Sequence, residues 1–350
     1  MIIAIKKELE MRKSELLKDK IETIYFGGGT PSILSKEDLQ GIFEVIYKNY
    51  QVVNKAEITL EANPDDLSTK KIQELAKSPI NRLSIGIQSF FEEDLKLMNR
   101  AHTAKESKKC LKDAIQYFDN ITIDLIYGIP GMSSKKWLSN LNQAFEFGVP
   151  HISSYALTVE EKTALHHFIK IGKIAPVNEN LALEHFKILV AETEKKGFVH
   201  YEISNFGKPS YFSKHNTSYW LGKKYIGIGP SSHTYNGFDR GWNVTNNAKY
   251  IKAISINRLP ITYEKLTKQN KFNEYVMTGL RTIWGVSLQK ISNDFGIKYK
   301  KELLKNAQKF VDNNLLEIIE DQTKSKILVT TKKGKFLADG IASDLFIINA

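Results

Sequence analysis

A run of three glycines, Gly27 to Gly29, lies in the segment Y-F-G-G-G-T-P-S between Tyr25 and Ser32, and Thr30 follows it. Glycines let a ligand approach the backbone closely and leave amide N–H groups pointing at it. Such a segment suits a carboxylate or an amino-acid-like group. It lacks the Gly-Lys-Ser/Thr sequence of a phosphate-binding P-loop and does not fit the dinucleotide pattern G-x-G-x-x-G. A tight turn before a helix is the alternative interpretation.

Polar side chains also follow or interrupt several apolar, strand-like runs. Glu61 ends I-T-L-E-A-N-P, Gln88 ends L-S-I-G-I-Q-S-F, Asp124 lies inside I-D-L-I-Y-G, and Ala156 follows S-S-Y. An acid inside an apolar strand is costly without a partner, so we expect a hydrogen-bond donor beside Asp124. Arg100, in M-N-R-A-H-T, is a candidate charge for a ligand carboxylate. Taken alone, Glu61 could cap a helix and Arg100 could lie on the surface.

The segment H-N-T-S-Y-W places an imidazole, His215, close to two aromatic rings, Tyr219 and Trp220. Imidazole is an iron ligand, and the rings offer flat apolar surface to a porphyrin. The alternative is an ordinary packed histidine beside aromatic residues. His233, in G-P-S-S-H-T-Y, could line the same region, whereas the histidines at 166–167 are expected on the surface of a helix.

Strand-like runs alternate with amphipathic helical patterns up to residue 204. The expected strands are Glu22–Gly27, Glu57–Glu61, Arg82–Gln88, Ile121–Ile126, His151–Leu157 and His200–Ser204. The helical patterns between them are Lys36–Tyr47, Ser68–Lys77, Ala104–Phe118, Ser134–Phe147 and Asn178–Lys196. This alternation predicts a parallel sheet with helices outside it. The candidate residues then gather at the carboxyl ends of the strands, where such sheets and barrels place their sites.

The remaining chain differs in composition and in its hydrophobic pattern. Residues 205–259 are rich in glycine, serine and aromatics, and we expect loops and short strands that close one end of the barrel. Residues 260–350 show helical patterns, two strand-like runs (L-L-E-I-I-E and K-I-L-V-T) and a last helix at Lys332–Phe346, which predicts a small winged-helix-like domain. The sequence opens with a helical pattern, Ile2–Leu17, where an α/β barrel normally opens with a strand. We therefore expect residues 1–204 to be a barrel whose first strand and loop are missing.

Together and in this order, G-G-G-T-P-S, L-E-A-N-P, S-I-G-I-Q-S-F, N-R-A-H-T and D-L-I-Y-G-I-P-G resemble the coproporphyrinogen oxidase-like branch of the radical S-adenosylmethionine (SAM) enzymes. The resemblance extends from Ile2 to the C-terminus. It implies an α/β fold, a partial (β/α)6 TIM-like barrel that holds a four-iron, four-sulfur cluster and SAM. Carried over by position, it implies that Gly28, Gly29 and Thr30 meet the methionine amino end, Glu61 contacts SAM, Gln88 and Arg100 bind its ribose and carboxylate region, and Asp124 and Ala156 line its ribose and adenine side.

One departure from this family is large. The family holds its cluster with three cysteines in a C-x3-C-x2-C motif, which this sequence does not contain. The single cysteine, Cys110, lies in a lysine-flanked helical pattern and cannot hold a cubane cluster by itself. We therefore expect this chain, as written, neither to assemble the cluster nor to carry out SAM radical chemistry.

Two subfamilies compete within this branch. Oxygen-independent coproporphyrinogen III oxidases (dehydrogenases) convert propionates to vinyl groups in porphyrin biosynthesis, whereas their heme chaperone relatives carry H-N-x-x-Y-W. The H-N-T-S-Y-W segment favours the chaperones. The resemblance then implies that His215 binds heme iron, that Tyr219 and Trp220 pack near the porphyrin, and that heme passes to an acceptor protein. Whether the chain is also an enzyme stays open.

Composition narrows the function classes. The chain has 350 residues, of which 42% are hydrophobic and 25% charged, as in globular proteins. It has no apolar run of the roughly 18 residues that cross a bilayer and no signal peptide, so we expect a cytoplasmic location, with peripheral membrane association still compatible. The net charge of +11 admits a third hypothesis, a nucleic-acid-binding winged helix. We disfavour nucleic acid because the lysines are dispersed among acids and Lys298–Asn313 needs its apolar face for a core.

Overall fold

The computed structural model describes residues 1–320 and 324–348. Contacts divide the chain into two compact units. We call residues 22–40 and 54–213 the barrel unit, and residues 1–21, 41–53 and 214–350 the C-terminal unit. The three-part division at residues 204 and 259 remains a prediction. Within the described part of the chain, no helix is both long enough and apolar enough to cross a membrane.

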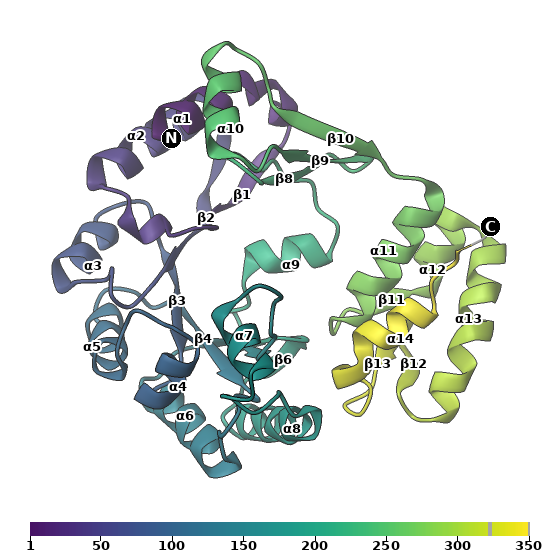
Figure 1. The fold of residues 1–350 in the computed structure, drawn as a ribbon. Helices are drawn as coiled ribbons and strands as arrows, with labels where there is room; N and C mark the ends of the chain where they lie inside the picture. The colour runs from purple at the N-terminus through teal and green to yellow at the C-terminus, as the bar shows by residue number, and fades with distance from the viewer. Residues whose placement is uncertain (321–323, 349–350) are drawn as a thin grey trace. The chain divides into compact units, whose positions relative to one another are not determined.

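A curled seven-stranded sheet has the order β1-β2-β3-β4-β5-β7-β6 (Figure 1). Its strands are β1 (Lys20–Phe26), β2 (Gln51–Ala62), β3 (Arg82–Gln88), β4 (Ile121–Tyr127), β5 (His151–Ala156), β6 (Val199–Glu202) and β7 (Asn205–Gly207). The helices between them are α2 (Lys36–Asn49), α3 (Thr69–Ala76), α4 (Glu92–Leu97), α5 (Ala104–Ala114), α6 (Ser134–Glu146), α7 (Ala164–Lys170) and α8 (Glu179–Lys195). Figure 1 shows α3, α5 and α6 along the outer side of the sheet. The expected partial (β/α) barrel is confirmed.

The two faces of this sheet differ in chemistry, because successive side chains of a strand point to opposite faces. One face is apolar and buried; its members include Leu60, Leu83, Ile85, Ile123 and Leu125. The other face is polar, since Glu61 pairs in register with Ser84, Ser84 with Thr122, and Asp124 with Ser153. The apolar face forms the core with the helices, and the polar face provides the candidate site.

The expectation of a parallel sheet is wrong at its last position. Strands β2 to β5 pair in parallel, but β7 pairs antiparallel with both β5 and β6. The Glu202 carboxylate stabilises the reversal, since its Oε1 accepts the Ser204 N–H at 3.1 Å and also a hydrogen bond from the Asn205 side-chain amide. This side-chain turn closes a hairpin where the sequence pattern indicated only the end of a strand.

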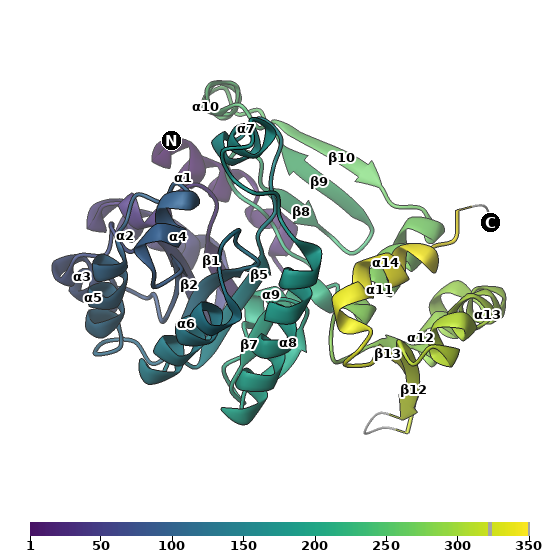
Figure 2. The ribbon, with the colours of Figure 1, turned by 60° about the horizontal axis from the view of Figure 1, so that its bottom comes forward.

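The C-terminal unit begins with α1 (Ile2–Met11), which ends earlier than the expected helix and is followed by a 3-10 turn, Lys13–Leu16. Helix α1 packs against α10 (Asn247–Ser255) through Ala4, Tyr250 and Ile254. Beside them, β8 (His233–Tyr235), β9 (Asp239–Asn243) and β10 (Ile261–Lys265) form an antiparallel sheet of order β10-β9-β8 (Figure 2).

Residues 205–259 contain two helices where we expected only loops and short strands. These are α9 (Lys214–Trp220) and α10, so the expectation was wrong for these segments. The Asn246 side chain caps α10 by accepting the Lys249 N–H at 3.0 Å. Asn246 lies in the polar run T-N-N, which we interpreted as part of a loop and not as the start of a helix. Helix α9 is short, and it carries the whole H-N-T-S-Y-W segment together with the lysine that precedes it.

The last part of the chain is the expected winged-helix-like domain, with one more strand than predicted. Its elements are α11 (Lys268–Leu280), β11 (Val286–Ser287), α12 (Leu288–Lys290) with a π-helical turn (Ile291–Phe295), α13 (Ile297–Asp312), β12 (Leu316–Glu320), β13 (Lys326–Thr330) and α14 (Ala338–Asp344). The three strands have the order β11-β13-β12. A common apolar core includes Phe272, Val276, Leu303 and Leu328. The last helix is shorter than the expected Lys332–Phe346.

Candidate functional site

The glycine segment at the end of β1 is held by one carboxylate from β2. The Tyr25 hydroxyl donates to Glu61 Oε1 at 2.6 Å, and the Gly28 N–H donates to Oε2 at 3.0 Å. Gly28 and Gly29 have φ angles of +75° and +64°, which favour glycine, and a Cβ added at either would meet no atom of the described residues within 4 Å. Gly27 is different, because its Cβ would lie 2.5 Å from Tyr25 Cε1. The segment is therefore an anchored turn with open space at Gly28 and Gly29.

The chain that follows this turn is tied to the next strand's loop. Thr30 O accepts the Ile33 N–H at 3.2 Å and starts a short 3-10 turn, Pro31–Ile33. The buried Ser32 hydroxyl donates to Asp66 Oδ2 at 2.7 Å. This bond links the loop after β1 to the loop after β2, so Thr30 and Glu61 belong to one connected rim.

Gln88 and Arg100 converge at the end of β3. A Cβ placed on Gly86 would lie 2.9 Å from Gln88 Nε2, 3.3 Å from Arg100 Nη2 and 3.7 Å from Asn63 Oδ1. Gln88 has a φ of +64°, and the pairing of β3 with β4 is irregular between Ile85 and Gln88. Strained backbone of this kind concentrates at functional sites. The absence of a side chain at Gly86 leaves room for three polar groups from three segments.

A buried histidine positions the loop that carries Arg100. His102 Nε2 lies 3.2 Å from the Ile87 carbonyl oxygen, and because a carbonyl only accepts, this nitrogen carries the proton. Burial lowers the pKa of His102, so the ring is neutral at pH 7. Sequence reasoning missed this role, although His102 stands in the same N-R-A-H-T segment as Arg100.

Asp124 lies on the polar face of the sheet, with its side chain hydrogen-bonded to Ser153. Burial, together with the nearby Glu61 carboxylate, raises the pKa of Asp124 to about 7, while Arg82 and Arg100 act in the opposite direction. The polar partner of Asp124 is therefore the Ser153 hydroxyl, which itself donates to Asn205 Oδ1 at 2.6 Å. A carboxyl group with such a pKa can accept or donate a hydrogen bond near neutral pH.

Ala156 lies at the end of β5, one residue out of phase with Asp124. The register pairs Ala156 with Tyr127, whereas Tyr155 pairs with Ile126 and shares the face of Ser153 and Asp124. Tyr155 is 43% exposed, and burial of its hydroxyl together with the Asp124 charge raises its pKa. Sequence reasoning missed Tyr155, because the pairing of β5 with β4 decides which β5 side chains share the face of Asp124.

Below this layer, a chain of buried polar groups crosses the same face of the sheet. Arg82 donates to Thr122 Oγ1, Thr122 Oγ1 lies 3.0 Å from His151 Nδ1, and His151 Nε2 lies 2.7 Å from the Tyr201 hydroxyl. Burial, and then the Arg82 charge, hold the pKa of His151 well below its usual range. The sequence did not indicate this buried polar floor beneath the candidate SAM residues.

In the C-terminal unit, the H-N-T-S-Y-W side chains divide into two groups. His215 Nε2 lies 3.1 Å from the Tyr219 hydroxyl oxygen, and the two rings meet edge to face with centroids 4.8 Å apart. Trp220 faces the Arg281 guanidinium, whose central carbon lies 5.1 Å from the ring centroid. Trp220 Nε1 is buried and has no hydrogen-bond partner among the described residues. His215 and Tyr219 thus form one partly exposed pair, and Trp220 packs against Arg281, the residue that follows α11.

The residues present do not supply the ligands of a cubane cluster. Cys110 is the one cysteine of the sequence, and it is buried on α5, where burial raises the pKa of its thiol to about 12. Among the residues that the structure describes, no three His, Cys, Asp or Glu side chains gather closely enough to hold a metal ion. We therefore derive no step through a cluster. The open turn at Gly28 and Gly29, by contrast, fits an amino-acid-like group.

Comparison with known proteins agrees with this geometry. A family model described as the radical SAM superfamily matches residues 4–155, and one described as the HemN C-terminal domain matches residues 266–337. The chain is 35% identical over 301 residues to the heme chaperone HemW of Lactococcus lactis, covering 85% of this chain and 79% of that protein. It is 30% identical to HemW of Mycobacterium tuberculosis, covering 98% of this chain and 85% of that protein.

The fold comparison points the same way. The structure of coproporphyrinogen III oxidase (HemN) from Escherichia coli, a radical SAM enzyme, superposes with a TM-score of 0.84 and 20% sequence identity. The match covers 99% of this chain and 82% of the HemN chain, and at this identity it establishes the fold alone. With the sequence matches, the conclusion is that the chain belongs to the HemW heme chaperone family of the radical SAM superfamily.

Proposed function

We propose that this chain is a heme chaperone that binds heme through His215 and passes it to an acceptor protein in the cytoplasm. The observation that carries the proposal is the His215–Tyr219 pair on α9: an imidazole and a phenol share one partly exposed helix face. Imidazole nitrogen is a common axial ligand of heme iron. Trp220, packed on Arg281, would fix the end of α9 near the porphyrin.

A second part of the proposal concerns SAM. Gly28 to Thr30 would receive the methionine end, because the Gly28 and Gly29 side of the turn is open. Glu61 would hold that turn in shape, and Arg100 would attract the carboxylate. Gln88, with Arg100, would bind the ribose and carboxylate region, while Asp124 and Ala156 would line the ribose and adenine side.

The cluster normally holds the methionine amino and carboxylate groups of SAM in this superfamily, and bound together they supply radical chemistry. Because the residues here provide one buried thiol, the expected SAM affinity is weak. For the same reason we do not propose porphyrinogen oxidation, the alternative that the family resemblance left open.

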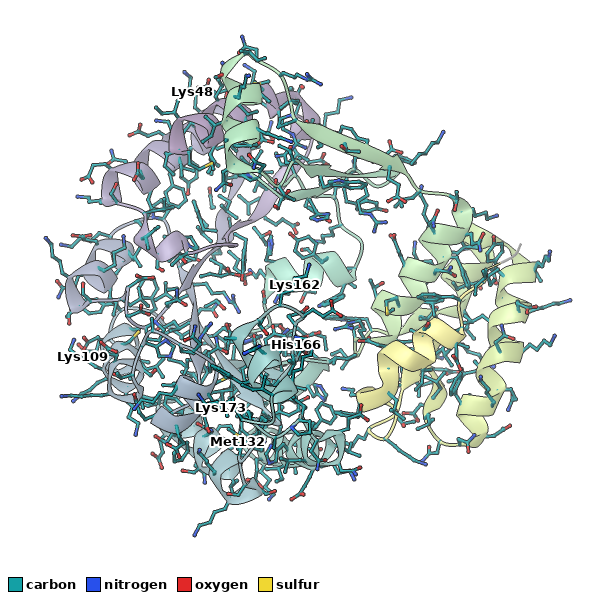
Figure 3. The ribbon with its side chains drawn as sticks, in the orientation of Figure 1. Lys48, Lys109, Met132, Lys162, His166 and Lys173 are labelled. Atoms are coloured by element: carbon teal, nitrogen blue, oxygen red, sulfur yellow. The ribbon has the colours of Figure 1, made fainter. Side chains whose placement is uncertain are left out.

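Hemin titration tests the heme part. The wild-type chain and His215→Ala are titrated with hemin, and the Soret band is followed. His166→Ala provides a matched control, because His166 lies on α7, a helix without buried residues (Figure 3). We expect His215→Ala to weaken binding at least about tenfold and to shift the Soret band, since an axial bond is lost. Equal affinity and an equal band in the wild type and His215→Ala would remove His215 as the ligand.

Transfer is tested separately. The heme-loaded chain is mixed with an apo-hemoprotein, and the rise of the acceptor's Soret band is compared with that from free hemin. A chaperone should transfer without a detectable pool of free hemin, so a heme scavenger should not slow the reaction. Complete interception by the scavenger would show simple release and contradict the transfer proposal.

A further inference from the structure

The β8–β9–β10 sheet of the C-terminal unit has two chemically different faces. Cross-strand pairing places Thr234 opposite Gly241 and His233 opposite Trp242. Because side chains alternate along a strand, Thr234 and Asn243 point to one face, while His233 and Trp242 point to the other. The first of these faces is buried, since Thr234 is 2% exposed and Asn243 is 1% exposed.

The buried face is fixed by an ion pair between Glu8 of α1 and Arg12, the residue that follows this helix. Arg12 Nη2 donates to Thr234 Oγ1 at 3.0 Å, and the Asn243 side-chain amide donates to Glu8 Oε1 at 2.8 Å. Arg12 and Glu8 are themselves 3.2 Å apart, with both side chains inaccessible to solvent. Bonds from two buried charges hold this side of the sheet in place, so the opposite face is presented on a rigid support.

That opposite face carries rings that continue to α9. Tyr225 forms an antiparallel bridge with Tyr235, and their ring centroids lie 6.4 Å apart. Tyr219 meets Tyr225 edge to face at 4.5 Å, and His215 meets Tyr219 at 4.8 Å. On the adjoining pair of β8 and β9, the His233 and Trp242 centroids lie 6.4 Å apart.

We define the aromatic row by its members: His215, Tyr219, Tyr225, Tyr235, His233 and Trp242. We propose that the aromatic row is the surface on which the tetrapyrrole plane lies, from the iron ligand on α9 across to β8 and β9. This inference rests on the proposed heme function and extends it to residues outside the H-N-T-S-Y-W segment. Aromatic rings favour flat π-systems through dispersion and quadrupole contacts, and a macrocycle is such a system.

The charges near the row distinguish this occupant from nucleic acid. Single-stranded nucleic acid also stacks on aromatic side chains, but a protein that binds it needs unpaired positive charges beside the phosphate backbone. Arg240, which is paired in register with Tyr235, contacts Glu264 at 3.0 Å and Glu274 at 2.9 Å. Two carboxylates therefore compensate this arginine. The row offers apolar ring surface rather than a phosphate-binding track, which favours a porphyrin.

The test compares hemin with metal-free protoporphyrin IX, because only the first can use an iron ligand. Trp242→Val and Tyr235→Val remove a ring and keep a residue that suits a strand. We expect each to weaken the binding of both ligands about tenfold, the effect of losing one stacked ring. Two control variants should keep an affinity within about twofold of the wild type. Tyr235→Phe keeps the ring, and Phe238→Ala changes a side chain that is 69% exposed in the turn between β8 and β9.

The outcomes separate this inference from the proposed function. Unchanged hemin affinity in both valine variants, with a loss in His215→Ala, would overturn the aromatic row and leave heme ligation standing. A second outcome is that the valine variants bind protoporphyrin more weakly while His215→Ala binds hemin as tightly as the wild type. This would support the aromatic row and contradict His215 as the iron ligand. Binding of neither ligand by the wild type would contradict both. If a valine variant unfolds by circular dichroism, His233→Val, at an exposed position, gives the same decision.

Discussion

The Nε2 atom of His215 lies 3.1 Å from the hydroxyl oxygen of Tyr219, one helical turn further along α9. The Nε2 atom of His215 is therefore already in contact with the phenol of Tyr219. If this nitrogen binds iron, the metal must displace the phenol. Tyr219 would then restrain the ligand in the heme-free chain, and it would make heme easier to release by offering the imidazole a replacement partner.

Tyr219→Phe should consequently tighten hemin binding. The substitution keeps the ring that meets His215 edge to face and removes only the competing hydroxyl. One neutral hydrogen bond contributes about 1 kcal/mol, so we expect an affinity gain of about fivefold and slower heme release. Equilibrium and stopped-flow hemin titrations measure both quantities. Weaker binding by Tyr219→Phe would show that the hydroxyl supports the heme complex instead.

Asp124 gives a pH prediction for the barrel unit. Its pKa is raised to about 7 from an ordinary 3.8, so between these values the folded chain holds a proton that the unfolded chain has lost. The stability from Asp124 is thus greatest at low pH and declines as pH rises toward 7. Asp124→Asn should be more stable than the wild type by about 1–4 kcal/mol at about pH 8, with the difference vanishing near pH 4.

The measurement must be a difference between variants at each pH, because other groups titrate in the same range. The pKa of the buried His151 is lowered, so its contribution to stability is lost as pH falls below the ordinary histidine value, opposite in sign to that of Asp124. Calorimetric unfolding of the wild type and Asp124→Asn across this range cancels the shared His151 effect. A constant difference at all pH values would contradict the raised pKa.

Gly27→Ala should disrupt the turn that precedes α2. The new Cβ would lie 2.5 Å from Tyr25 Cε1 and 3.1 Å from Glu61 Cδ, so the pair that anchors the turn must separate. Overpacking of this kind costs about 1–3 kcal/mol. Gly340→Ala is the control, since a Cβ there meets no atom within 4 Å in the part of the chain that the structure describes, and alanine favours a helix. Equal unfolding temperatures for Gly27→Ala and the wild type would contradict the close contact.

The fold was largely predictable because the strands are bounded apolar runs, and β3 has the expected limits, Arg82–Gln88. The β6–β7 hairpin was not predictable, because it depends on the Glu202 side chain bonding to Ser204 and Asn205. Helix α9 spans Lys214–Trp220, too short for a clear helical period, and tertiary contacts such as the one to Arg281 support it.

The candidate site, like the fold, could be predicted only in part from the sequence. The motif residues could be named from the sequence, but the sequence did not show which β5 side chains face the site. A shift of one position moves a side chain to the other face of the sheet. Tyr155 rather than Ala156 therefore shares the face of Asp124. The convergence of Gln88 and Arg100 depends on the missing side chain of Gly86. Such relationships arise from pairing between strands, which local patterns do not encode.

The chain as written should bind no four-iron cluster. Cys110 is buried and its thiol pKa is about 12, so it offers no thiolate at neutral pH. After anaerobic reconstitution with iron and sulfide, we expect Cys110→Ala and the wild type to carry the same small amount of adventitious iron. About four irons per chain, with the broad visible absorption of a cluster, would contradict this prediction.

The Glu8–Arg12 pair should be a major source of stability for the C-terminal unit. Arg12→Met leaves the buried Glu8 carboxylate without its cation, although Asn243 and Tyr250 still donate to it. Loss of one partner of a buried pair costs about 3–5 kcal/mol. The double variant Glu8→Gln/Arg12→Met should lose less, because it leaves no buried charge. Arg240→Met, which breaks partly exposed pairs, should cost less than about 1 kcal/mol. Urea unfolding at neutral pH measures all three, and a double variant less stable than Arg12→Met would contradict the assignment of the loss to an uncompensated Glu8 charge.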